Sequence, residues 1–338
     1  MDFSDGGVPP IAFAQMLSSP ALDPAAVSRF RNIMARAGTD EATLVQRDIQ
    51  APLRWFREVY PDLDADQATE LGLVCAEQAQ VTSFGPLSVP LVSAGSVSEI
   101  VELLTFLPLI STAISPQFHP GEHGLSVGLT AHAGDPDLDR LVVTYAGSAL
   151  LRLLDLLVGE VSAVTLNLTG PVPANLARHE DVATGRLVFD APTSFLYVPA
   201  EALREVCRFA DPLAYRHAIT DLEQALQRRA GATSLSDRVR QLLDAGSGLR
   251  SSQAVAGELS MSVSTLKRRL GDEGASFRDL REVSLRERAV LRLLDRSVSV
   301  SEIATDLGYS DLGNFSHAFK RWTGQSPSQF RRTHERAW

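Results

Sequence analysis

The sequence has few cysteines and no long apolar run. Cys75 and Cys207 are its only cysteines, and neither has the Cys-x-x-Cys or other spacing of a metal site. This usage is typical of buried structural thiols in a reducing compartment. The longest apolar run, LLTFLPLISTAI (103–114), contains Pro108 and is too short to span a bilayer. We therefore expect a cytoplasmic protein that does not enter a membrane.

Motifs of common enzyme classes are also missing: there is no GxSxG, P-loop or dinucleotide fingerprint. His119 and His123, in HPGEH, have the i, i+4 spacing of helical metal ligands, but Pro120 and Gly121 favour a loop. The run DPDLD (135–139) lacks the Gly and closing Glu of a calcium loop, so it is interpreted as a turn between strands. We predict no catalytic residue, no cofactor and no metal site.

Charge is distributed unevenly along the chain. The total is −9, with 32 Lys and Arg against 41 Asp and Glu. Residues 231–338 contain 17 Lys and Arg against 13 Asp and Glu, a net charge of +4, which leaves −13 for the remainder. A basic segment attached to an acidic body is a candidate for nucleic-acid binding.

The first two thirds of the chain contain both helical and strand-like patterns. Residues 10–80 have apolar residues three and four apart, as in AAVSRFRNIMARAG and APLRWFREVY, and are predicted to be helical. After Gly124, four short segments bounded by turn residues predict strands: GLSVGLTAH, RLVVTYAG, AVTLNLTG and GRLVFDA. The Leu-rich SALLRLLDLLVG predicts a helix over one face of the sheet. Residues 1–230 are therefore expected to form an α+β domain with a mixed sheet.

A domain boundary is predicted near residue 231, where a charged Gln-Arg-Arg is followed by Ala-Gly-Ala. The helix predicted before it has an apolar stripe of Ile219, Leu222 and Leu226. Such a stripe usually packs against its own domain, and a dimer contact is the alternative. Residues 231–338 are expected to form an all-α domain.

One pattern occurs twice in this last third. VAGELSMSVSTLKRRL (255–270) and IATDLGYSDLGNFSHAF (303–319) each have an Ala, a Leu three residues later, a turn, a hydroxyl residue and a second helix. This is the helix-turn-helix pattern, in which a small Ala lets the helices cross closely. Two units are expected, at about 252–271 and 300–321. Gly308 suits a turn with positive φ.

A long helix is predicted to join the units. FRDLREVSLRERAVLRLLDR (277–296) predicts about 17 helical residues, or about 25 Å. With the width of each helix pair, the two second helices would lie about 34 Å apart, which is one turn of DNA. One chain could then occupy two adjacent major grooves.

Capping residues mark the helix starts. Ser262 and Ser310 are the predicted N-caps of the two second helices. Ser299 with Glu302 has the spacing of a capping box, and SPSQ (326–329) combines a cap, a proline at the first position and the reciprocal Gln.

The second helices are predicted to bury one face and present the other to DNA. Leu266 with Leu270, and Phe315 with Phe319, are four residues apart and anchor the buried face, where Trp322 is also expected. The predicted DNA-contacting residues are Ser262, Ser264, Thr265, Lys267, Arg268, Arg269, Ser310, Gly313, Asn314, His317, Lys320 and Arg321. Such donors can read base edges or hold phosphates. A merely solvated helix face is the alternative.

Residues 234–333 resemble the DNA-binding domain of the AraC/XylS family of bacterial transcription regulators. The resemblance rests on Ser-x-x-x-Leu-x-Arg-x-Leu at 262–270 and on EIATDLGYSD followed by FSHAFKRWTGQSPSQFR. SFGPLSVPLVSAGSVSEIVELL and GRLVFDAPTSFLYVPAEAL resemble the family's arabinose-binding-type regulator domain. The sequence departs from the family at His317 and Leu285, where Arg is common, and at Gly313, where Ser is usual.

The resemblance implies a regulator whose C-terminal domain binds double-stranded promoter DNA. Its N-terminal domain would bind a small-molecule effector, form a homodimer, or both, and RNA polymerase would be a partner of an activator. Two alternatives are a dimerisation-only domain without a ligand and an enzyme domain fused to a DNA-targeting module. The second has no assembled set of catalytic residues in the sequence to support it.

Overall fold

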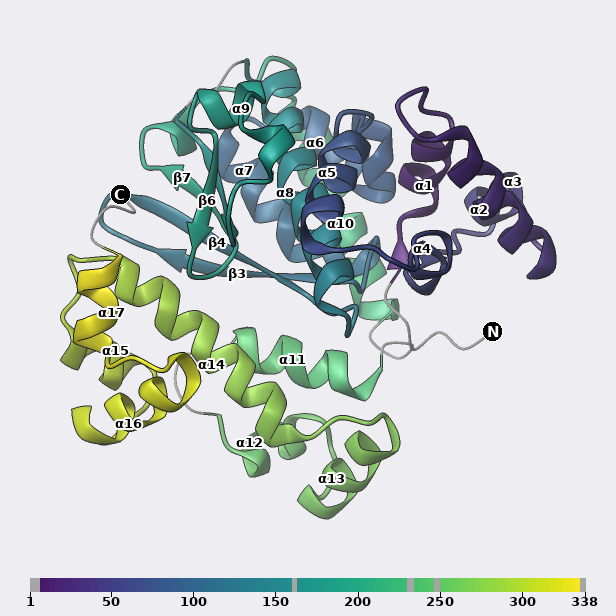
Figure 1. Ribbon diagram of the computed structural model, residues 1–338. Coiled ribbons are helices and arrows are strands. Elements are labelled where there is room, and N and C mark those ends of the chain that lie inside the picture. Colours follow the sequence, from purple (N-terminus) through teal and green to yellow (C-terminus); the bar gives the residue numbers. More distant parts are fainter. Residues whose placement is uncertain (1–6, 160–162, 230–233, 246–249, 335–338) are drawn as a thin grey trace. The chain divides into compact units, whose positions relative to one another are not determined.

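A computed structural model describes residues 7–159, 163–229, 234–245 and 250–334 (Figure 1). The chain divides into two compact units. The first unit comprises residues 1–116 and 123–229, and the second comprises residues 117–122 and 230–338. The boundary predicted between residues 230 and 231 lies outside the described residues.

The first unit begins with short helices, as predicted for residues 10–80. They are α1 (Pro10–Leu17), α2 (Pro24–Arg36), α3 (Glu41–Gln46), α4 (Arg54–Val59) and α5 (Ala65–Ala76), with a small sheet of β1 (Gly7–Val8) and β2 (Ala51–Pro52). Aspartate side chains at positions 23, 40 and 64 cap α2, α3 and α5. Phe30 packs edge-on against Phe13 and Phe56, with ring centroids 5.4 and 5.0 Å apart.

The longest apolar run of the sequence is explained by burial. After α5 come the 3₁₀ helix η1 (Val81–Leu87), α6 (Ser88–Ser93), α7 (Val97–Glu102) and the 3₁₀ helix η2 (Leu103–Leu109). Leu103, Leu104, Leu107 and Leu109 of η2 are all buried. Within the described ranges, no helix combines the length and apolar character needed to cross a bilayer.

A mixed five-stranded sheet follows, as expected for the α+β fold. Its strands are β3 (Ile114–Pro120), β4 (Gly124–Ala131), β5 (Thr165–Thr169), β6 (Leu187–Ala191) and β7 (Phe195–Pro199), in the order β3-β4-β7-β5-β6. Strand β7 is antiparallel to both β4 and β5, whereas β5 and β6 are parallel. Predicted strands correspond to β4, β5 and β6, while β3 and β7 were not predicted.

One of the four strand predictions, that for RLVVTYAG (140–147), is wrong. It lies inside α8 (Pro136–Leu157), a single long helix that also contains the predicted Leu-rich helix. The Asp135 side chain accepts hydrogen bonds from the N–H groups of Asp137 and Leu138, at 3.0 and 3.2 Å, and Pro136 occupies the first helical position. The run 135–139 is therefore a helix start and not a turn between strands. Gly72 in α5, which has no side chain, leaves room for the β-branched Thr144 of α8.

The loop predicted for HPGEH is only partly correct. His119 and Pro120 belong to β3, and residues 121–123 connect β3 to β4. Among the described residues, no group of three or more His, Cys, Asp or Glu could hold a metal ion. Cys75 and Cys207 are free and buried, as predicted.

The apolar stripe before the boundary packs within its own unit. The remaining elements of this unit are η3 (Ala174–Leu176), α9 (Glu180–Ala183), η4 (Ala202–Arg204) and α10 (Pro212–Arg229). Helix α10 packs against α6 and η2. Leu222 is buried in this contact, and Ile219 and Leu226 are half-buried.

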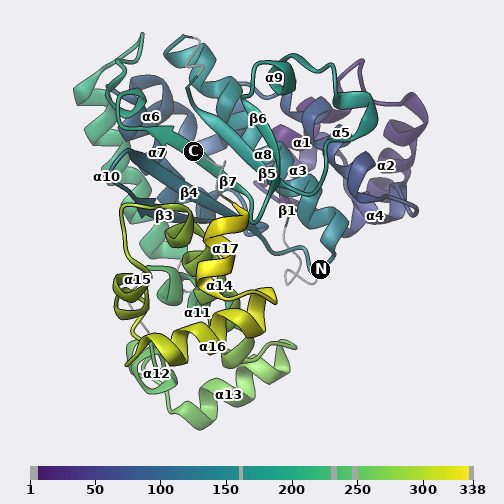
Figure 2. The same cartoon turned by 60° about the vertical axis from the view of Figure 1, so that its left-hand side comes forward.

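The described secondary structure that follows the boundary is all helical, as expected. It consists of α11 (Leu235–Ala245), α12 (Ser252–Glu258), α13 (Val263–Asp272), α14 (Phe277–Leu294), α15 (Val300–Asp306), α16 (Leu312–Thr323) and α17 (Pro327–Thr333). Helices α12 with α13, and α15 with α16, are the two helix-turn-helix pairs. They are joined by α14, the long helix predicted from the sequence, and α13 and α16 lie on the same side of it in both views (Figures 1 and 2).

Candidate nucleic-acid interface

Helix α13 of the first pair has one buried and one exposed face. Leu266 and Leu270 are 1% and 0% exposed and pack in a core with residues of α11 and α12, including the small Ala256. This burial confirms the predicted anchor pair and fixes the orientation of the helix. The opposite face consequently presents Ser264, Lys267 and Arg268 to solvent.

The start of α13 is capped as predicted. The Ser262 hydroxyl accepts a hydrogen bond from the Thr265 N–H at 3.1 Å, and the hydroxyl oxygens of the two residues are 2.8 Å apart. Because these hydroxyl groups are engaged in the cap, their first role is to start the helix. Ser264 is exposed beside them.

The basic residues of α13 differ in their surroundings. Partial burial alone would raise the pKa of the Glu273 carboxyl, but hydrogen bonds from Ser236 and Leu235 at the start of α11 outweigh it and lower the pKa, with a smaller contribution from the nearby Arg269. In the part of the chain that the structure describes, neither Lys267 nor Arg268 has an ion-pair partner. These two cations are therefore available to an anionic ligand such as the DNA backbone.

Helix α16 of the second pair is anchored by aromatic packing. Phe315 and Phe319 are both 0% exposed, with ring centroids 5.8 Å apart, and Phe319 packs edge-on against Phe330 of α17 at 5.3 Å. This confirms their assignment to the core rather than to base stacking. Trp322 is half-buried, with its ring 6.5 Å from that of Tyr309.

The predicted N-cap of α16 is wrong by one residue. Asp311, and not Ser310, caps the helix, with Oδ1 accepting from the Asn314 N–H at 2.7 Å. A carboxylate is favoured there because it also interacts with the positive end of the helix dipole. The Asn314 side chain donates to Asp311 Oδ2 at 2.6 Å and to Ser310 Oγ at 3.3 Å. The Asn314 Nδ2 group must therefore leave these partners before it can donate to a base.

The remaining predicted residues of α16 are exposed. Gly313, His317 and Lys320 are in contact with solvent, and Arg321 forms an exposed ion pair with Glu282 of α14 at 3.4 Å. An exposed pair of this length is worth little, so Arg321 can exchange Glu282 for a phosphate at small cost.

Helix α17 is tied to the joining helix by contacts that the sequence did not predict. The Arg331 guanidinium donates to the carbonyl groups of Leu293 and Asp295, at 3.1 and 3.0 Å, and so ties α17 to the end of α14. Leu285 is 4% exposed. Leu285 therefore serves the core of this unit and offers no contact to DNA.

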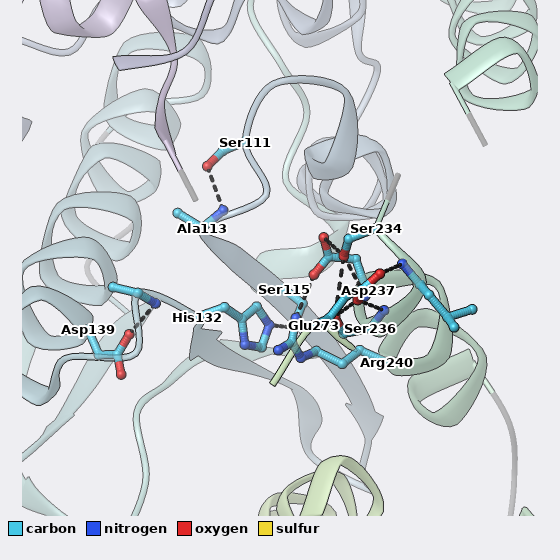
Figure 3. A network of polar contacts seen from close by, with 12 residues as sticks. Ser111, Ala113, Ser115, His132, Asp139, Ser234, Ser236, Asp237, Arg240 and Glu273 are labelled. Atoms are coloured by element: carbon cyan, nitrogen blue, oxygen red, sulfur yellow. Dashed lines mark hydrogen bonds and ion pairs between the residues drawn. The ribbon is translucent and has the colours of Figure 1, made fainter. Parts of the chain in front are cut away.

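In the first helix-turn-helix pair, Glu273 connects the end of α13 to the start of α11 (Figure 3). Its carboxylate accepts from the Leu235 N–H at 2.9 Å and the Ser236 N–H at 2.8 Å, while Ser234 bonds Asp237. These contacts satisfy amides that have no acceptor inside α11. The sequence did not reveal this role of Glu273, because the residue and the amides that it accepts from are 37 and 38 positions apart.

Known families match both parts of the chain. Residues 29–206 match the arabinose-binding domain found at the N-terminus of AraC transcription regulators, and residues 255–333 match a helix-turn-helix domain. The first match alone covers more than half of the chain.

Sequence relatives include transcriptional regulators of other bacteria. The HTH-type transcriptional regulator VqsM of Pseudomonas aeruginosa is 27% identical over 274 residues, which cover 77% of this chain and 83% of VqsM. The uncharacterized HTH-type transcriptional regulator Rv1395 of Mycobacterium tuberculosis is 45% identical over 112 residues, 33% of this chain and 32% of that protein. The crystal structure of the transcriptional regulator CdpR from Pseudomonas aeruginosa aligns with a TM-score of 0.41 at 22% identity, covering 92% of this chain and 99% of CdpR.

The family and these relatives are transcription regulators and not enzymes. The chain belongs to the AraC family of DNA-binding transcription regulators, with the family's N-terminal regulator domain and a C-terminal helix-turn-helix region.

Proposed function

We propose that residues 231–338 form the DNA-binding domain and that α13 and α16 enter two adjacent major grooves of promoter DNA. One observation carries this proposal: each of these helices buries an apolar pair completely and presents polar and basic side chains on the opposite face. The joining helix α14 has 18 residues, or about 27 Å. That length is compatible with a separation near one turn of DNA, about 34 Å, once the helix pairs are added.

The exposed side chains suggest different roles in the two grooves. Arg268 is the best candidate for a base contact, because a guanidinium without a competing carboxylate can bond guanine in a bidentate manner. Lys267, Lys320 and Arg321 fit phosphate contacts. Asn314 and His317 would contact bases or phosphates after Asn314 leaves Asp311.

We further propose that the protein is a cytoplasmic regulator. Its first unit would bind a small molecule, and this binding would change promoter occupancy. A ligand that prefers one arrangement of this unit would shift the fraction of protein competent to bind DNA, typically by about 1 to 3 kcal/mol. RNA polymerase is a further partner if the outcome is activation.

Dimerisation is a second candidate role for the first unit, and exposed apolar residues favour it. A groove between α6 and α10 is flanked by Val89 and Leu213, which are 61% and 72% exposed. Large apolar side chains this exposed are typical of contact surfaces when they cluster. Sedimentation equilibrium of the parent chain and of the Leu213→Asp variant tests this role. The parent chain should be a dimer, and the variant should be a monomer.

The DNA-binding proposal is tested by selecting bound sequences from random DNA with the full chain, with and without an extract of cell metabolites. We expect one enriched motif with two half-sites about one helical turn apart. The affinity for the selected site should fall steeply with salt, since each neutralised phosphate contributes a slope of about −0.9. A complex insensitive to salt, or the absence of any enriched sequence, would contradict the proposal.

A further inference from the structure

The first unit contains a cavity with apolar walls. It lies among α1, α5, α8, η1 and η2 and has a volume of about 90 Å³. Met16, Phe56, Leu107, Val142 and Leu150 are typical of its lining. The described residues that line it include no charged side chain.

The two serines on the cavity wall are already satisfied by the protein. Ser83 Oγ accepts from the Gln80 N–H at 2.9 Å and donates to the Gln15 side chain. Ser111 Oγ donates to the Gly7 carbonyl at 2.7 Å. Neither hydroxyl has its proton free for a ligand.

Tyr145 of α8 is different. Its ring packs against a cluster of small residues, Ala76, Ala79 and Ala149, and it also lines the cavity. Tyr145 is half-buried, and among the described residues its hydroxyl forms no hydrogen bond. Tyr145 is therefore a polar group that a molecule in the cavity could satisfy.

The ionisable groups on the wall are neutral at physiological pH. Burial raises the pKa of the Tyr145 hydroxyl well above its usual range, so it remains a donor. Burial also raises the pKa of the neighbouring Cys75 thiol to about 12, so no thiolate forms there. The cavity consequently offers no counter-charge to an ionic ligand.

We propose that this cavity is the effector site and that it takes a small, uncharged, mostly apolar molecule whose single polar group bonds to the Tyr145 hydroxyl. An apolar cavity of about 150 Å³ accepts benzene. This cavity, at about 90 Å³, is smaller, so one aromatic ring is the upper limit of ligand size and enters only with small shifts of the wall side chains. The inference rests on the proposed sensing function and specifies the chemistry of its ligand.

A sugar does not fit this cavity, despite the arabinose in the family's description. A pentose has several hydroxyl groups, and each one buried without a partner costs about 1 to 3 kcal/mol. Tyr145 could satisfy only one of them. The wall of this cavity therefore disfavours polar ligands and favours apolar ones.

The proposal is tested by titrating the full chain, without DNA, with benzene, phenol and L-arabinose, and by recording ligand-detected NMR saturation transfer. Benzene and phenol should both bind, and phenol should bind about 2- to 10-fold more tightly because of one added hydrogen bond. L-arabinose should give no transfer.

Tyr145→Phe is the decisive variant because it removes the hydroxyl and leaves the ring. In this variant benzene should bind as in the parent chain, and the preference for phenol should be lost. Tyr215→Phe is the matched control, because the Tyr215 hydroxyl bonds the Glu99 carbonyl at 3.3 Å and does not line the cavity. It should retain the preference.

Binding of L-arabinose in place of the aromatic probes, or a preference for phenol that survives in Tyr145→Phe, overturns the proposal. Failure of this assay is distinguishable from failure of the DNA-binding function, since the salt titration on the selected site contains no ligand. Phenol binding that depends on Tyr145 supports the cavity assignment whatever the outcome on DNA.

Discussion

The Glu273 carboxylate accepts a hydrogen bond from the backbone N–H of Ser236, with 2.8 Å between the oxygen and the nitrogen. Glu273 immediately follows α13, whereas Ser236 lies in the first turn of α11. The end of the proposed recognition helix is thus joined to the start of a helix 37 positions earlier in the chain. A carboxylate at a helix start is also stabilised by the helix dipole.

Replacing Glu273 with Gln should destabilise the second unit by about 1 kcal/mol at pH 7, a value reduced for the partial exposure of the site. Partial burial alone would raise the pKa of Glu273, but the hydrogen bonds from Ser236 and Leu235 lower that pKa below its unfolded value. Its contribution is therefore present above the unfolded pKa and is lost as the pH falls through the folded one. Urea unfolding from pH 7 down to about pH 3 should show the parent and variant converging.

Asp272→Asn is the matched control for Glu273→Gln. It removes the same charge from the neighbouring position, where the side chain is exposed. This variant should unfold like the parent chain at every pH. Equal destabilisation by both substitutions would show that net charge, and not the contact with α11, is responsible.

Two glycines in the helix-turn-helix pairs should respond to Ala in opposite directions. Gly308, in the turn before α16, has a φ of 82°, which an L side chain adopts only with strain. Gly308→Ala should therefore destabilise the chain by about 1 kcal/mol or more. Gly257 lies inside α12 with open space where a Cβ would be. Gly257→Ala should stabilise by about 0.5 to 1 kcal/mol.

Thermal unfolding of the two variants beside the parent checks this prediction. Because the substitutions are chemically identical, their difference isolates the backbone conformation. A stabilised Gly308→Ala variant would mean that the turn has room to adopt another conformation.

Local signals made the second unit predictable. Caps at Ser262, Ser299 and Ser326 form as expected, because a capping residue and the amide it satisfies are only three positions apart. The buried pairs of α13 and α16 are likewise separated by one helical turn. Asp311 was missed because two adjacent residues, Ser310 and Asp311, can both cap, and a carboxylate has the added dipole term.

Long-range packing made the first unit harder to predict. RLVVTYAG has the β-branched content of a strand, but the cap at Asp135 starts a helix that passes through it and packs on α5. Tertiary contacts overrode local propensity there. The cavity near Tyr145 was invisible in the sequence, because its walls come from segments that are far apart along the chain.

Arg268→Ala should relax the sequence preference of DNA binding at one base position, at a cost of about 1 to 3 kcal/mol on the preferred site. The physical reason is the loss of a bidentate contact to guanine. Binding measured on the selected site and on single-base variants of it checks this expectation. Arg47→Ala, at an exposed position after α3, changes the net charge equally and should leave the preference intact.

An equal loss of affinity on every sequence would show that Arg268 contacts a phosphate and not a base. In that case the preference profile keeps its shape while the salt slope decreases by about 0.9. The two roles are thus separated by one set of titrations.

His317→Arg should strengthen DNA binding by α16, because the exposed imidazole is replaced by a longer side chain with a fixed charge. We expect affinity to rise about 3- to 10-fold at low salt. If the new guanidinium reaches a phosphate, the salt slope steepens by about 0.9. If it reaches a guanine, one base position of the second half-site becomes more selective and the slope changes little. An affinity and slope equal to those of the parent chain would place residue 317 outside the interface and confine recognition by α16 to Asn314, Lys320 and Arg321.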